Sequence, residues 1–411
     1  MASSPISEPF TLKSGLVLQN RLIKTATAEN LGDKKYLPTE ALVEAYETWA
    51  NGGWGMVITG NVQVDARYLG QPHDVAYNEA VEYKQMLESW KKWAAPYKNS
   101  NSHAVVQINH PGRQSPAGSG TKGYFTKSIA PSPVPLSLGK EFFPRIMSTL
   151  IFGTPRQMTL AEIKETTQQF ARTARLAADA GFPGVELHAA HGYLLAQFLS
   201  EKTNKRTDEY GGSAAARTKI VVEIIEAIRA VVPKGFTVGI KNNSVDHRSP
   251  KALADSITQL KLIAQAGIDF LEISGGTYED PQLVAGLNTN LKSVTVKERS
   301  REAFFLEFAR TIRDEFPGLP LIITGGFRSR NVIESAITEG ALDLVGMARP
   351  AILNPSVPIN TILNNSVQEK DAKAYARLIE PSWLLRKIGN VVIGAGVETV
   401  WYGKQIVNMG K

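Results

Sequence analysis

The sequence predicts an α/β fold, a closed (β/α)8 TIM barrel, from three observations. Short apolar runs rich in Val, Ile and Leu on both faces recur through the first 350 residues, which is typical of parallel strands covered on both sides. Helical patterns separate these runs, and such alternation predicts a parallel sheet joined by crossovers. The runs number eight, which favours a closed barrel over an open doubly wound sheet.

The strands and helices alternate in chain order. Strands are expected near Arg21–Ala28, Gly55–Asn61, Ala104–Asn109, Gly184–His188, Thr237–Asn242, Asp269–Ser274, Pro320–Thr324 and Asp343–Met347. Helices are expected at Thr39–Asn51, Glu79–Tyr97, Thr159–Ala180, Ser213–Val232, Ala252–Ala266, Ser300–Phe316 and Ser329–Glu339. The helix at Thr159 opens with a capping-box spacing to Glu162.

Three segments fall outside the repeating unit. Residues 8–20 predict an N-terminal hairpin at the bottom of the barrel. Residues 111–157 show no clear helix, and half of residues 111–138 are Pro, Gly or Ser, so a long loop after strand three is expected to select the substrate, with a tolerated surface insertion as the alternative. Helical patterns at Lys370–Gly389 and Glu398–Met409 predict a C-terminal helical extension.

These segments give a single barrel domain with an appendage. The barrel is expected to span residues 6–355, and the extension to span residues 356–411. We expect the extension to pack on the barrel or on a neighbouring subunit, which makes a homodimer a candidate assembly.

Composition excludes several classes of function. Lys and Arg outnumber Asp and Glu by 46 to 39, but the surplus forms no basic stripe of the kind that binds nucleic acid. The absence of cysteine excludes disulfides, thiolate zinc sites, Fe–S clusters and a cysteine nucleophile. No signal peptide is evident, and no apolar stretch reaches the length of about 18 residues that a membrane span needs. A cytoplasmic enzyme without nucleic-acid or membrane partners is therefore expected.

The predicted strand ends carry polar residues, and barrel enzymes keep their active sites at these ends. Strand four ends at His188, and His191 follows three residues later. Their two imidazole N–H donors, about one oxygen apart, would bind a carbonyl oxygen or an anion. The alternatives are a structurally satisfied pair, or a zinc site with Glu186 or Glu201, which lie at no recognised spacing.

A second group of residues suits a phosphate-bearing cofactor. Gly325 and Gly326 follow strand seven and Arg349 follows strand eight, where barrels usually bind phosphate. Gln107 can donate and accept at the edge of a polar ring, and Lys241 can face an electron-rich ring. FMN fits this pattern, although the residues alone indicate only a phosphate-bearing cofactor in a barrel.

Several runs resemble the Old Yellow Enzyme family of flavin-dependent oxidoreductases. The matching segments are Asn20-Arg-Leu-Ile-Lys24, Gln107-Ile-Asn-His-Pro-Gly-Arg113, residues 185–200 with their His-x-x-His-Gly-Tyr motif, Arg206-Thr-Asp-Glu-Tyr-Gly-Gly-Ser213, Leu271-Glu-Ile-Ser-Gly-Gly-Thr-Tyr278, Ile323-Thr-Gly-Gly326 and Leu344-Val-Gly-Met-Ala-Arg349. They occur in the family's order, cover about residues 6–355, and are similar to fungal members.

The resemblance implies a barrel that holds FMN, with NADPH or NADH as the reductant. Gln107 and Lys241 would contact the flavin pyrimidine, and Gly325, Gly326 and Arg349 would hold the phosphate. The remaining implied cofactor contacts are Thr27, Ala28, Gly60 and Ala348. Ala28 stands where relatives carry Thr or Cys, so a different flavin potential is expected, with Thr27 as the neighbouring candidate.

The resemblance also implies the reaction. His188 and His191 would hold the substrate's electron-withdrawing oxygen, and Tyr193 would be the proton donor. In the family, hydride passes from flavin N5 to the β-carbon of an activated alkene, and the proton goes to the α-carbon. An NAD(P)H-driven ene-reductase acting on small α,β-unsaturated molecules without a metal is therefore expected. The alternatives are a flavin-dependent isomerase or oxidase of a biosynthetic pathway, or a non-redox barrel enzyme that binds phosphate or a metal.

Overall fold

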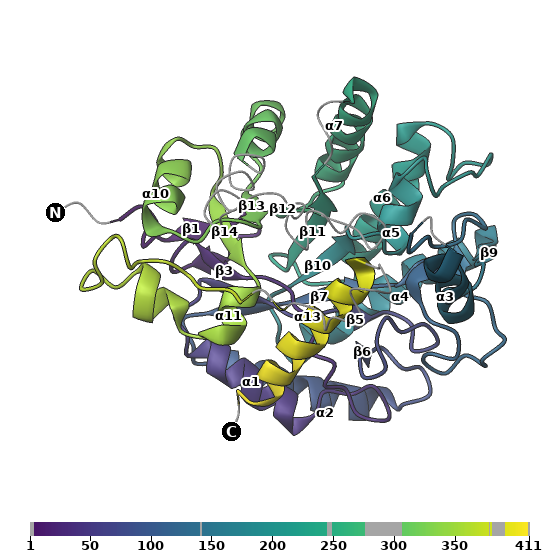
Figure 1. Cartoon of the computed structure of the whole chain (residues 1–411), viewed down its shortest axis with the longest axis horizontal. Coiled ribbons are helices and arrows are strands. Elements are labelled where there is room, and N and C mark those ends of the chain that lie inside the picture. The colour runs from purple at the N-terminus through teal and green to yellow at the C-terminus, as the bar shows by residue number, and fades with distance from the viewer. Residues whose placement is uncertain are drawn as a thin grey trace.

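A closed barrel of eight parallel strands forms the centre of the computed structural model (Figure 1). The structure describes residues 4–139, 142–244, 249–275, 306–377, 379 and 391–409. The barrel strands are β3 (Leu22–Lys24), β4 (Met56–Ile58), β7 (His103–Asn109), β10 (Gly184–Ala189), β11 (Thr237–Asn243), β12 (Phe270–Ser274), β13 (Leu321–Thr324) and β14 (Leu344–Met347). Pairing of β14 with β3 and of β7 with β10 closes the ring. All eight predicted strands are confirmed, and the first two are shorter than expected.

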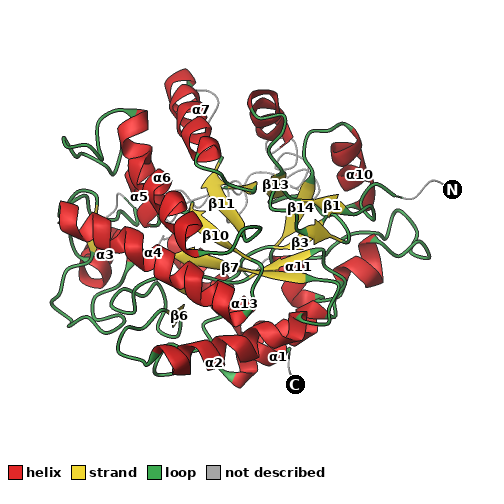
Figure 2. Ribbon diagram, turned by 180° about the vertical axis from the view of Figure 1, so that it is seen from behind, coloured by secondary structure: helices red, strands yellow, loops and turns green. Residues whose placement is uncertain are grey.

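Helices surround this barrel, as Figure 2 shows. The larger helices are α1 (Glu40–Ala50), α2 (Tyr83–Ala94), α4 (Leu160–Ala180), α6 (Ala214–Val231), α7 (Pro250–Gln265) and α10 (Arg330–Thr338). The shorter ones are η1 (Ala95–Tyr97), α5 (Leu194–Leu199), α11 (Arg349–Leu353) and the π-helix η3 (Pro358–Ile362). Residues 306–315 are helical, and residues 300–305 of the helix predicted at Ser300–Phe316 lie outside the described residues.

Helix α4 shows how local sequence sets an element's limits. The Thr159 hydroxyl accepts from the Glu162 backbone N–H at 3.2 Å, and the Glu162 carboxylate accepts from the Thr159 N–H at 2.9 Å. This is the predicted capping box. The helix ends at Gly181, whose φ of 98° is a left-handed conformation that glycine adopts without steric cost.

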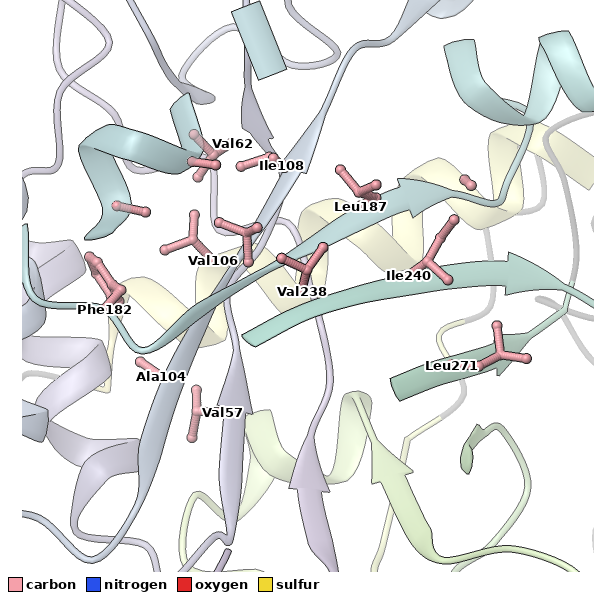
Figure 3. Packing of buried hydrophobic residues seen from close by; sticks show 14 of the residues in the cluster. Val57, Val62, Ala104, Val106, Ile108, Phe182, Leu187, Val238, Ile240 and Leu271 are labelled. Carbon is pink, nitrogen blue, oxygen red and sulfur yellow. The ribbon is translucent and has the colours of Figure 1, made fainter. Parts of the chain in front are cut away.

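Two apolar regions hold the barrel together. The outer region lies between strands and helices and includes Val57, Leu187 and Ile240 (Figure 3). The inner region fills the barrel bottom and includes Phe270, whose ring occupies the space at Gly239 so fully that an added Cβ would lie 2.0 Å from it. Full burial of such side chains stabilises the fold by about 1.5–3 kcal/mol each.

The predicted N-terminal hairpin closes this inner region from below. Strands β1 (Phe10–Thr11) and β2 (Val17–Leu18) pair antiparallel. Leu12 and Leu18 are buried and pack in the same cluster as Phe270. The hairpin thereby keeps water from the barrel bottom and leaves the opposite end for the site.

The connection after β7 differs from the prediction. It contains η2 (Gly112–Gln114), the short parallel strands β8 (Ile129–Ala130) and β9 (Arg156–Gln157), and a helix, α3 (Phe142–Phe152). The expectation of no clear helix in residues 111–157 was therefore wrong. The helix lies beyond the segment rich in Pro, Gly and Ser, and it is anchored by the Ser148 hydroxyl, which donates to the Leu136 carbonyl.

The structure of the C-terminal extension also differs in part from the prediction. A helix was predicted at Lys370–Gly389, but residues 370–377 and 379 are not helical, and residues 378 and 380–389 lie outside the described residues. The backbone there pairs with another segment instead, since the Ala374 N–H donates to the Arg328 carbonyl at 2.9 Å. The last helix, α13 (Val391–Val407), begins before the predicted Glu398 and packs against α1 and α11.

Two short strands, β5 (Val62–Gln63) and β6 (Val75–Ala76), extend the sheet beside β7. Within the described ranges, no helix is both long and apolar enough to cross a membrane.

Candidate active site

A buried polar layer lies above the apolar barrel bottom. Gln107 on β7 donates from Nε2 to the Glu186 carboxylate at 2.6 Å, because strand register places these two residues side by side. On the next strands, Lys241 Nζ lies 2.7 Å from Glu272 Oε1, and their side chains are 3% and 0% exposed. Two carboxylates and one ammonium group therefore share the barrel interior.

The surroundings shift the pKa values of Glu186 and Glu272 in opposite directions. Burial, followed by the nearby charge of Glu272, raises the pKa of Glu186 well above its usual range. Burial also opposes the charged form of Glu272, but Lys241 and hydrogen bonds from Glu186 and Thr324 lower the pKa of Glu272 overall. Burial thus favours the protonated form of Glu186, whereas Lys241 favours the ionised form of Glu272.

His188 lies within β10, and the turn after this strand carries His191 in a strained backbone. His191 has a φ of 56°, which is uncommon for a residue other than glycine. Two contacts hold it: its N–H donates to Asn243 Oδ1 at 3.1 Å, and its carbonyl accepts from Gln114 Nε2 at 2.9 Å. Strain of this kind clusters at functional sites, where the surroundings fix it.

The two imidazoles bond to each other. His188 Nδ1 accepts from the Ala190 N–H at 3.2 Å, His188 Nε2 lies 3.2 Å from His191 Nδ1, and His191 Nε2 lies 3.2 Å from Ser274 Oγ. This pattern assigns the proton of each neutral ring to Nε2. The two imidazoles therefore donate in series, His188 to His191 and His191 to Ser274, and do not both point their N–H groups at one position. A substrate oxygen that binds here must replace one of these two hydrogen bonds.

Both rings are neutral at physiological pH. Burial lowers the pKa of His188 well below its usual value, and the neighbouring His191 and Lys241 lower it further. Burial, then Lys241, lowers the pKa of His191 to about 3, although Glu272 partly opposes this. Neutral imidazoles can donate one hydrogen bond each without adding positive charge to the site.

Tyr193 lies directly beside the histidines. It precedes α5, its ring centroid is 4.8 Å from that of His188 at 84°, and its side chain is largely buried. Its hydroxyl accepts a long hydrogen bond of 3.4 Å from Asn61 Nδ2. The structure therefore brings together the three residues that the sequence selected for catalysis.

The end of the first barrel strand meets the loop after β4. The Gly60 N–H donates to Glu29 Oε1 at 2.7 Å, and a Cβ at Gly60 would lie 1.9 Å from Glu29 Oε2 and 2.5 Å from the Thr27 carbonyl. Glycine is therefore required here. Ala28 follows Thr27 in this turn and offers no side-chain hydrogen bond.

At the predicted phosphate site, Arg349 contacts a carboxylate that the sequence did not predict. Gly325 and Gly326 have φ values of 123° and 98° after β13, and Ala348 caps the start of α11. Arg349 Nη1 donates to Glu398 Oε1 of α13 at 2.8 Å. Because 49 residues separate the two, no local pattern indicates this contact.

Other contributors were also missed. Four residues that contact the predicted site residues were not predicted from the sequence: Glu272, Ser274, Asn243 and Asn61. Glu186 was considered only as a metal ligand. A signal existed for Glu186 and Glu272, since a carboxylate in the middle of an apolar barrel strand needs a buried partner.

The donor set fits FMN. Buried side-chain oxygens without a hydrogen-bond partner lie at strand ends around the mouth in the described part of the chain, and Thr27 Oγ1 and Asn61 Oδ1 are among them. Lys241 on β11 and Arg349 after β14 supply cations on different sides of the barrel. A ligand with a polar ring edge and an anionic end suits this set. No cluster of three or more His, Asp or Glu side chains suited to a metal occurs in the described part of the chain.

Comparison with known proteins decides the family. The model of the NADH:flavin oxidoreductase / NADH oxidase family matches residues 5–364. The chain belongs to this family. It is 46% identical over 400 residues to "NADH-dependent flavin oxidoreductase iliE" of Hypocrea jecorina, which covers 97% of this chain and 99% of that protein.

Two further comparisons agree. The chain is 48% identical over 397 residues to iliE of a Neonectria species, with 95% of this chain covered, but it spans only 52% of that protein's length. The structure of an Old Yellow Enzyme homologue from Zymomonas mobilis superposes with a TM-score of 0.67 at 22% identity, over 87% of this chain and 91% of that one. The predicted fold and family resemblance are confirmed, and the family implies FMN and NAD(P)H as cofactors. The roles of individual residues stay predictions.

Proposed function

We propose that this flavin oxidoreductase is an NAD(P)H-driven ene-reductase, which reduces the C=C bond of small molecules activated by a carbonyl or similar group. The observation that carries the proposal is the neutral His188–His191 pair lying beside Tyr193 at one end of the barrel. These residues can hold an electron-withdrawing oxygen and deliver a proton next to it. Bound FMN would supply the hydride.

The cofactor would be held by residues from several strands. Gln107 and Lys241 are proposed to contact the polar edge of the ring, and Thr27, Ala28 and Gly60 to line it. Gly325, Gly326, Ala348 and Arg349 are proposed to bind the phosphate, which explains positive φ angles at two adjacent glycines.

The histidines would polarise the substrate. A carbonyl oxygen that accepts from His191 Nε2 replaces the bond to Ser274, and His188 steadies His191 from behind through Nε2. Because both imidazoles are neutral, His191 would stabilise developing negative charge on that oxygen by hydrogen bonding, without transferring a proton to it, and His188 would act through its bond to His191. Donation from a fixed, buried ring requires little reorganisation as the charge develops.

Tyr193 would complete the reaction by giving its hydroxyl proton to the α-carbon. Tyrosine has an ordinary pKa of about 10, which suits an acid that protonates an enolate carbon. Asn61 donates to the Tyr193 hydroxyl. The hydroxyl oxygen is the acceptor in this bond, so its own proton would remain available for the substrate.

One observation favours an isomerase as a second candidate. The histidine chain and Tyr193 form an acid–base set made entirely of this chain's residues. A carbonyl polarised by the histidines has an acidified α-C–H, so proton removal and return could move a double bond or invert a carbon with no net electron transfer.

A reaction in D2O with NADH and a simple enone tests the proposal. An ene-reductase consumes NADH in proportion to product and places one solvent deuterium on the α-carbon. Recovery of α-deuterated starting material without NADH consumption would contradict ene reduction and support the isomerase.

A further inference from the structure

The C-terminal helix brings a carboxylate to the proposed phosphate-binding arginine. Glu398 of α13 accepts from Arg349 Nη1 at 2.8 Å, and the two side chains are 10% and 24% exposed. The family model ends at residue 364, so this contact comes from beyond the part of the chain that defines the family. Figure 1 shows α13 in yellow near α11 and α1.

Helix α13 is held in place independently of Glu398. The Tyr402 hydroxyl accepts from the Arg377 N–H at 2.9 Å and donates to the Arg377 carbonyl at 2.8 Å. The Arg377 guanidinium lies 5.5 Å from the Trp401 ring centroid, and Ile406 is buried. Glu398 is therefore a fixed acceptor rather than a mobile surface carboxylate.

We propose that Glu398 is a positioning residue, which orients the Arg349 guanidinium toward the FMN phosphate. The proposal rests on the proposed role of Arg349. The contact to Glu398 uses one N–H of a planar group that has five. The remaining N–H donors keep the rigid planar geometry that matches phosphate oxygens. Because Glu398 already orders the long Arg349 side chain in the FMN-free protein, binding of the phosphate costs less conformational entropy.

Glu398 carries a negative charge as well as an acceptor oxygen, and the two have opposite effects on a phosphate. The charge repels a bound phosphate, whereas the acceptor fixes the arginine. The variant Glu398→Gln keeps an acceptor and removes the charge, and Glu398→Ala removes both. Orientation therefore predicts that only the alanine variant binds phosphate poorly.

The test compares two ligands that differ only in the phosphate. Dissociation constants of FMN and riboflavin are measured by flavin fluorescence on the full chain. We expect wild type to prefer FMN, Glu398→Ala to lose about tenfold of that preference, as one lost charge-assisted hydrogen bond implies, and Glu398→Gln to stay within about threefold of wild type. Riboflavin affinity should not change.

A matched control separates positioning from helix docking. Tyr402→Phe removes the bonds to Arg377 and leaves Arg349 and Glu398 intact, so it should not alter the preference for FMN over riboflavin. An unchanged or increased preference in Glu398→Ala overturns the proposal, as does an equal loss of both affinities. Wild type that binds FMN no better than riboflavin would overturn the role of Arg349 itself, and the proposal with it.

Discussion

Removal of the Lys241 ammonium group should destabilise the protein in a pH-dependent way. At 2.7 Å from Glu272, with an effective dielectric constant of about 20, the attraction is about 6 kcal/mol, much of which offsets desolvation. Loss of one partner of a buried pair costs about 3–5 kcal/mol, since the other charge stays buried. The variant Lys241→Met keeps the side-chain length, and we expect it to lose that much stability at pH 8.

The sign of the pH dependence follows from Glu272. Without Lys241, burial raises the pKa of Glu272 in the folded protein above its unfolded value of about 4.3. The folded variant then binds more protons than the unfolded chain, so its stability falls as pH rises above about 4. The deficit relative to wild type should be smaller at pH 5.5 than at pH 8.

Urea unfolding followed by tryptophan fluorescence measures both effects. The double variant Lys241→Met, Glu272→Gln should recover most of the loss, because no unpaired charge remains. The control Lys261→Met breaks an exposed pair with Glu315, whose side chains are 52% and 37% exposed, and should cost less than about 1 kcal/mol. A Lys241→Met variant that unfolds like the control at both pH values would refute this description of the polar layer.

Three further predictions concern the catalytic residues. Tyr193→Phe should slow alkene reduction by at least about tenfold and spare reduction of the flavin by NADH, measured separately by stopped flow; equal losses in both half-reactions would argue against a proton donor. The double variant His188→Ala, His191→Ala should abolish binding of small phenols to the oxidised protein in spectral titrations, and retained affinity would contradict the assigned oxygen site. Because the pKa of His191 is about 3 when folded and about 6.5 when unfolded, wild type should lose stability as pH falls below 6.5. His191→Asn should reduce that loss, and an unchanged pH dependence would oppose a buried neutral imidazole.

Much of the fold was predictable because its signals are local. A doubly covered strand such as β10 is apolar on both faces, and the Thr159 capping box fixes the start of α4 from four residues. The prediction was wrong where tertiary contacts decide. Residues 370–377 are not helical because their backbone pairs with the loop after β13, and α3 follows a segment rich in Pro, Gly and Ser that predicts a loop.

In the site, too, features set by local sequence were predicted, and features set by tertiary contacts were not. Gln107, Lys241 and the two histidines were predicted because the ends of parallel strands converge. The mutual hydrogen bond of the histidines depends on the strained turn at His191, which residue spacing does not encode. Glu398 could not be predicted to contact Arg349, because the contact depends on how α13 docks.

The central claim is a flavin site that accepts electrons from a nicotinamide. The most direct measurement is the visible absorption spectrum of the purified protein, recorded before and after NADH or NADPH is added without oxygen. We predict an oxidised-flavin band near 450 nm that bleaches with the reductant and returns on addition of an enone. A colourless protein that takes up no added FMN, or a flavin band that neither nicotinamide bleaches, would contradict the claim.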